Sequence, residues 1–156
     1  YDLGVDDSVL KNCALKHLNL ADVAQIRRAA YQADFTRAHV ASLSYAVANA
    51  AKLADEDALQ ILDQAAAALV DLASTVIRHF EQSEVPVSLI GGLTGMGGLL
   101  TGRFQRILQE RLPTCKYCEP YFKPIVGAAL YVMYEFEHET SMNTMFVQNL
   151  MRGLED

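Results

Sequence analysis

The sequence predicts a mainly α-helical chain with a small parallel β element, an α/β fold in a single domain over residues 1–156. Ala and Leu dominate the composition, and both residue types favour helices. Apolar residues recur every three or four positions through much of the chain, which is the spacing of amphipathic helices. One apolar run, 85–90, is instead rich in β-branched residues and predicts a buried strand.

Four helices are expected along the first half of the chain. Asp6, Asp7 and Ser8 can cap the first, Asn19 or Asp22 opens the second, and Asp55 can cap the longest. The third helix is expected from about Thr36. The longest helix is expected from Glu56 to Phe80. At about 1.5 Å per residue it would span roughly 38 Å, enough to cross a domain.

Glycines follow the predicted strand, and Gly91 and Gly92 end it. A glycine-rich loop then leads into a helix that Pro113 stops, and a second short strand is expected over 116–120. Buried strands must pair, because unpaired backbone groups are costly inside a protein. Two short strands are few for a parallel sheet, so we expect pairing partners outside this chain.

The last predicted elements are helical. Pro124 is expected in the first turn of a helix, where its missing N–H costs nothing. A further amphipathic helix is expected over 140–154, rich in Met. Its apolar face has two interpretations, a homodimer or interlobe contact and simple packing. The first residue is Tyr1, with neither an initiator Met nor a signal peptide, so we expect a longer protein.

Composition excludes several classes of function. The net charge of −6 argues against non-specific nucleic-acid binding, which needs clustered Lys and Arg. No apolar run reaches the length of about 18 residues that a membrane span needs. Three cysteines leave one unpaired in any disulfide scheme, so we expect a cytoplasmic protein.

The strand, the glycines and the helix after them form the most informative unit. Glycines at the end of a parallel strand let a ligand approach the backbone, and the next helix offers free N–H groups. An ordinary tight turn without a ligand is an equal alternative. The unit is neither a P-loop, since Gly-Lys-Ser/Thr is absent, nor a dinucleotide site, since the Gly-x-Gly-x-x-Gly spacing is absent.

Three segments in this order, 55–62, 87–92 and 124–130, resemble the C-terminal lobe of the BadF/BadG/BcrA/BcrD ATPase family, which includes N-acetylglucosamine and glucosamine kinases. The resemblance implies a ribonuclease H-like lobe of the actin, Hsp70 and sugar-kinase superfamily, with ATP and Mg as cofactors of the intact protein. It implies nucleotide binding by Gly91, Gly92, Leu93 and Thr94, and an interlobe hinge at Pro124, Gly127 and Ala128. Ordinary close helix packing is the alternative for the hinge residues.

The family's phosphate motifs and its catalytic Asp have no counterpart in this sequence. Phosphoryl transfer needs groups that position and neutralise the γ-phosphate, so we expect no catalytic residue and no kinase activity from this chain alone. The missing N-terminal lobe and a sugar are then the partners of the intact enzyme. Two alternatives stay open: the lobe of a BadF-type activator ATPase, and a helical interaction domain that binds no nucleotide.

Cys115 and Cys118 have the spacing of a zinc or redox pair. A structural zinc site needs four ligands, and the sequence has no second Cys-x-x-Cys, so no metal site is predicted. The alternative is two small, partly buried residues on a short strand. A run of aromatic residues between Tyr131 and His138 is interpreted as core or lobe interface.

Overall fold

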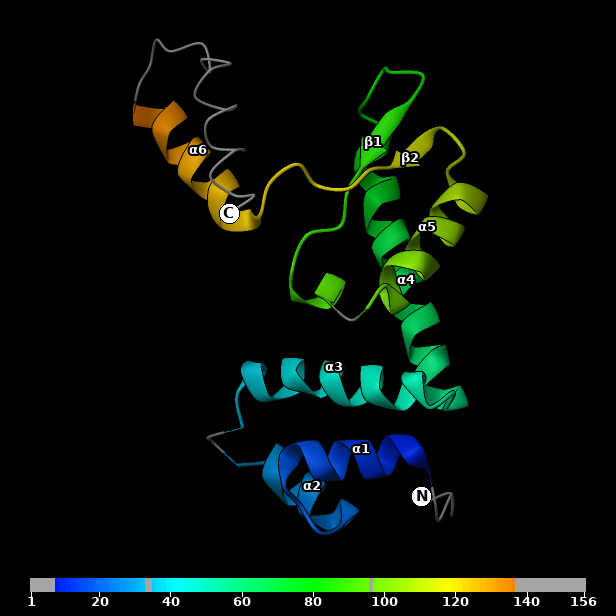
Figure 1. Ribbon diagram of the computed structural model, residues 1–156, viewed down its shortest axis with the longest axis vertical. Coiled ribbons are helices and arrows are strands. Elements are labelled where there is room, and N and C mark those ends of the chain that lie inside the picture. The colour runs from blue at the N-terminus through cyan, green and yellow to red at the C-terminus, as the bar shows by residue number, and fades with distance from the viewer. Residues whose placement is uncertain (1–7, 33–34, 96, 137–156) are drawn as a thin grey trace. The chain divides into compact units, whose positions relative to one another are not determined.

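The computed structural model describes residues 8–32, 35–95 and 97–136. The chain divides into two compact units, Tyr1–Glu119 and Pro120–Asp156 (Figure 1). The described part is mainly helical and contains one sheet of two parallel strands. The predicted fold class, mainly α with a small parallel β element, is therefore confirmed.

Four helices open the first unit. They are α1 (Val9–Leu18), α2 (Val23–Ala30), α3 (Arg37–Lys52) and α4 (Glu56–Ile77). The side chains of Ser8, Asp22 and Asp55 cap α1, α2 and α4 by accepting a backbone N–H from the first turn. Asp6 and Asp7 lie outside the described residues, and Asn19 ends α1 in a left-handed conformation instead of opening α2. The helix predicted to reach Phe80 ends at Ile77.

The sheet consists of β1 (Val85–Val87) and β2 (Cys115–Tyr117), paired in parallel with Val85 opposite Cys115. A short 3-10 helix, η1 (Gly92–Gly95), and α5 (Leu99–Arg111) connect the two strands. Both strands are shorter than predicted: β1 stops at Val87 rather than residue 90, and β2 lies at 115–117 rather than 116–120.

Only one face of the sheet is covered by described residues. Val85 and Cys115 point into a cluster with residues of α4 and α5, whereas Pro86 and Lys116 point the other way and are exposed. Parallel sheets are normally covered on both faces.

Helix α4 contributes to two separate apolar clusters. Ala58 and Leu62 pack with Ala50 and Ala51 of α3. One turn further along, α4 packs against α5 and the sheet. The buried members of that second cluster are Ala66, Val70, Val85, Leu100, Phe104, Ile107, Leu108 and Cys115.

Among the described residues, α4 is also the one helix long and apolar enough to cross a membrane by length and composition. Asp63 and Asp71 on this helix form ion pairs with arginines of α5. Core helices of water-soluble domains meet the same two criteria, so length and composition alone do not make α4 a membrane span.

The second unit contains α6 (Pro124–Phe136), which begins at Pro124 as predicted. Ile125 and Tyr131 are exposed on this helix. The predicted tail helix over 140–154 and His138 lie outside the described residues, as do the side chains of Tyr134 and Phe136.

Candidate functional site

The candidate site is the turn that follows β1. Gly91 has a φ of 129°, a conformation that L side chains rarely adopt, so glycine is required here by the backbone alone. Thr94 closes the turn twice, since its N–H and its hydroxyl both donate to the carbonyl of Gly91, at 3.1 and 2.7 Å. Residues 91–94, predicted as one site from the sequence, are therefore held together as one hydrogen-bonded turn.

Gly92 has no such structural requirement. Its φ lies outside the positive region that favours glycine, and a Cβ added there would meet no atom within 4 Å. Packing and backbone strain thus give no reason for a glycine at this exposed position. Close approach of a ligand to the backbone does give one.

The turn stands at the edge of the sheet where both strands end, because β1 and β2 run in parallel. Ser88 and Cys118 meet at this edge: the Ser88 hydroxyl donates to the carbonyl oxygen of Cys118 at 2.8 Å and lies 3.1 Å from its Sγ. Tyr117 lies just before them and stacks edge-on against Phe104. In open α/β sheets this edge is the usual place of a ligand.

Tyr117 is the one described residue at this edge with a clearly displaced pKa. Burial raises the pKa of the Tyr117 phenol above its ordinary value of 10.0, and the hydrogen-bonded carboxylate of Glu119 raises it further. The phenol is therefore a neutral hydrogen-bonding group at neutral pH. It is unsuited to serve as a general base there.

The start of α5 forms the second half of the glycine loop. Gly97 and Gly98 have φ values of 67° and 78°, and Gly98 is the N-cap of α5 without a side-chain cap. A shallow hollow of about 350 Å³ lies beside them. Arg103 and Arg106 line it, but both are paired with Asp63 and Arg106 is also paired with Glu110, so their charge is largely compensated.

The predicted hinge residues belong to the second unit, whereas the predicted nucleotide site belongs to the first. Pro124, Gly127 and Ala128 are exposed on α6, and a Cβ at Gly127 would meet no atom within 4 Å. No described neighbour thus requires a small residue at Gly127, and the hinge stays a prediction.

Cys115 and Cys118 are free thiols in different surroundings. Cys115 is buried in the core cluster with Phe104, while Cys118 is half-buried at the sheet edge. In the described ranges 8–32, 35–95 and 97–136, no group of three or more His, Cys, Asp or Glu could hold a metal ion. Cys115 lies on β2, as the alternative interpretation expects, whereas Cys118 lies just past the end of that strand.

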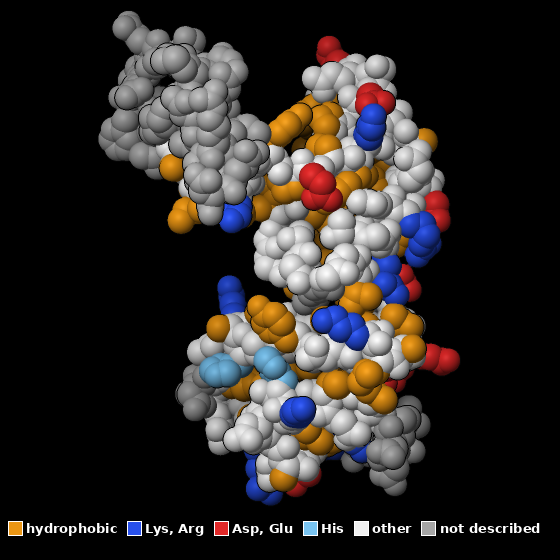
Figure 2. Space-filling model, in the orientation of Figure 1, with side chains coloured by type: hydrophobic (Ala, Val, Ile, Leu, Met, Phe, Trp, Pro, Cys, Tyr) orange, Lys and Arg blue, Asp and Glu red, His pale blue; other side chains and the backbone are white. Residues whose placement is uncertain are grey.

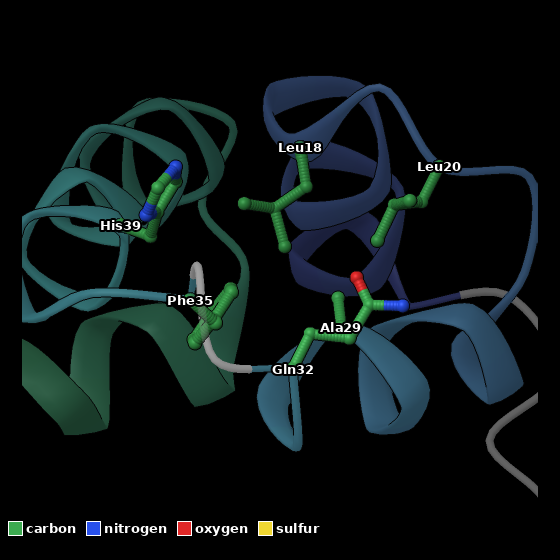
Figure 3. A pocket seen from close by; sticks show the side chains of 6 residues that line it. All are labelled: Leu18, Leu20, Ala29, Gln32, Phe35 and His39. Carbon is green, nitrogen blue, oxygen red and sulfur yellow. The ribbon is translucent and has the colours of Figure 1, made fainter.

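A hollow among the first three helices was not singled out from the sequence. It has a volume of about 170 Å³ and an apolar wall with two polar groups (Figure 3). The side chains of Leu18, Leu20 and Gln32 point toward one another across it, and Phe35 stacks on His39 at its border. Phe35 directly precedes Thr36, the N-cap of α3, and an apolar residue at that position often packs on the first turn of the helix, which is the signal that could have indicated this pair.

Charged side chains are interspersed on the face drawn in Figure 2, where apolar side chains also reach the surface. The most exposed apolar side chains of α4 are Leu72 and Val76, at 65% and 55%.

The comparisons with known proteins give no relative: no family model, curated protein or solved structure matches this chain.

Proposed function

We propose that this chain is the adenosine-side ATP-binding lobe of a two-lobed amino-sugar kinase. The observation that carries the proposal is Gly92. It is an exposed glycine that neither packing nor backbone strain requires, in a hydrogen-bonded turn at the carboxyl edge of two parallel strands. Such a turn can lay its backbone against a flat nucleoside without an intervening Cβ.

Residues 91–94 would contact the nucleoside, and the other lobe would supply the phosphate contacts and the catalytic base. Mg would arrive bound to the ATP phosphates, since the described residues hold no cluster of carboxylates that could bind it alone. The sugar, N-acetylglucosamine or glucosamine, would bind the intact protein, which we place in the cytoplasm. Pro124, Gly127 and Ala128 would form this lobe's half of the hinge.

The sheet supports the need for a second lobe. Its two strands leave Pro86 and Lys116 on an uncovered face, and neither strand has a second neighbour among the described residues. A sheet of two short parallel strands is marginal without further strands or a covering layer.

The test is titration calorimetry with ATP and Mg on the intact protein that carries this chain. Because a Cβ at Gly92 meets open space, Gly92→Val should fold normally and yet weaken ATP binding at least tenfold. Ala68→Val, which introduces the same side chain at an exposed position of α4, is the control and should bind as the wild type does. Equal affinities of Gly92→Val and the wild type would contradict the proposal.

One observation favours a second candidate, a helical interaction domain that binds no nucleotide. The exposed apolar side chains of Ile61, Leu72 and Val76 lie on one side of α4. Absence of any ATP-dependent heat in the intact protein would favour this candidate. The BadF-type activator is a weaker alternative, because it would need cysteines at a subunit surface and Cys115 is in the core.

A further inference from the structure

The ladder between β1 and β2 ends for a specific reason. Its outermost backbone bonds are Val85 N–H to the Thr114 carbonyl, 2.9 Å, and Cys118 N–H to the Val87 carbonyl, 3.0 Å. In a regular parallel ladder the next bond would join the Leu89 N–H to the Cys118 carbonyl. The Leu89 N–H makes no such bond, and the Cys118 carbonyl accepts the Ser88 hydroxyl at 2.8 Å.

The second contact of the hydroxyl follows from its single proton. Ser88 donates this proton to the Cys118 carbonyl, so the Cys118 thiol is the donor in the 3.1 Å contact with Oγ. Both residues are half-buried, which limits competition by water. Ser88 thus binds the residue after β2 through two contacts while its own backbone leaves the sheet.

We propose that Ser88 is a positioning residue for the nucleotide site, because its hydroxyl ends the ladder and thereby sets where the Gly91–Thr94 turn stands. This inference rests on the proposed function. The turn is closed internally by Thr94, so its place at the sheet edge depends on the path of residues 88–90. Without the hydroxyl, the Leu89 N–H can bond Cys118 and draw that path back into the sheet.

The experiment measures two quantities in the intact protein, the dissociation constant for ATP with Mg and the exchange rate of the Leu89 amide hydrogen. For Ser88→Ala we expect about tenfold weaker ATP binding and slower exchange at Leu89, because the ladder gains a bond. Loss of stability alone would instead make this exchange faster. Ser88→Thr keeps the hydroxyl and should restore both values.

Two variants control for other effects. Ser74→Ala removes a hydroxyl that donates to a backbone carbonyl on the exposed surface of α4, at 2.7 Å, and should leave both values unchanged. Cys118→Ala removes the thiol and keeps the carbonyl, so ATP binding should stay within about twofold of the wild type.

The outcomes separate this inference from the proposed function. If the wild type binds ATP and Ser88→Ala binds equally well, or if Leu89 exchanges faster in Ser88→Ala, the inference is wrong and the proposed function stands. If the wild type binds no nucleotide, both are wrong. Weaker binding together with slower exchange at Leu89, restored by Ser88→Thr, supports both.

Discussion

A single carboxylate, that of Asp55, caps two helices, and its removal should cost more than the loss of an ordinary cap. One oxygen accepts the N–H of Ala58 in the first turn of α4 at 2.9 Å, and the other accepts the N–H of Leu10 in the first turn of α1 at 3.0 Å. Leu10 lies far away in sequence, so Asp55 also joins α1 to the start of α4. We predict that Asp55→Ala destabilises both helix ends at once.

The magnitude follows from the two bonds. Loss of an N-cap side chain costs about 1 kcal/mol. A partly buried donor left without its partner costs about 1 kcal/mol more. Removing a negative charge from two positive helix ends adds a few tenths each, for a total of about 2–3 kcal/mol in the free energy of unfolding. Asp55→Asn keeps one acceptor oxygen and should cost about half as much.

The assay is urea unfolding followed by circular dichroism at 222 nm, a helix signal, with the slope of the transition compared between variants. Asp57→Ala is the matched control, because Asp57 is an exposed carboxylate in the same first turn of α4. It should cost only a few tenths of a kcal/mol. If Asp55→Ala costs no more than Asp57→Ala, or if Asp55→Asn costs as much as Asp55→Ala, the double cap does not stabilise the chain as argued.

Three further predictions concern backbone conformation, ionisation and packing. Ala54 has a φ of 60°, so Ala54→Gly should raise the free energy of unfolding by about 1 kcal/mol. The same change at exposed Ala68 within α4 should lower this free energy by about 1 kcal/mol. Urea unfolding of both variants tests the two opposite signs. The pKa of Tyr117 is raised in the folded chain, so the unfolded chain loses this proton first and stability should fall as pH rises above about 10. Between about pH 9 and about pH 11, Tyr117→Phe should lose less of its free energy of unfolding than the wild type. Equal losses in the two proteins over this range would refute the prediction. Phe104 is 1% exposed, so Phe104→Ala should lower the free energy of unfolding by about 3–5 kcal/mol, measured by urea unfolding. Phe104→Leu should lower it much less. Similar losses for the two variants would mean that the cluster collapses around the cavity.

The helices could be predicted because their determinants are local. Ser8, Asp22 and Asp55 each cap the helix that begins at the next residue, and the cap bond reaches only three positions along the chain. The start of α6 at Pro124 follows from the same kind of local rule. Helix ends were less predictable: α4 stops at Ile77, although apolar spacing continues to Phe80.

Strand length could not be predicted, because it depends on a contact across the fold. The run from Val85 to Ile90 contains one polar residue, Ser88, but the sequence does not show which group its hydroxyl bonds. Ser88 directly follows β1, and its hydroxyl donates to the carbonyl of Cys118, a partner 30 positions later. The second hydrogen bond of Asp55 could not be predicted either, because its partner Leu10 is 45 positions away.

For the candidate site, the sequence indicated the turn at Gly91 and Gly92 but not why each glycine is there. The positive φ of Gly91 and the open space at Gly92 distinguish a conformational requirement from an unexplained glycine. The hollow beside Phe35 and His39 escaped prediction because three separate helices form it.

The shared use of α4 by two clusters has a consequence for how the first unit responds to a ligand. Ala58 and Leu62 belong to one cluster and Ala66 and Val70 to the other, so a single uninterrupted helix links them. The start of α5 repeats the pattern, since Leu99 packs on the first cluster and Leu100 belongs to the second. Opening either cluster requires the same two helices to move, which makes the unit one cooperative block in hydrogen exchange. If a molecule binds at the glycine turn, we expect slower hydrogen exchange also at the amides of α3, and this remote protection would report binding without a probe attached to the turn.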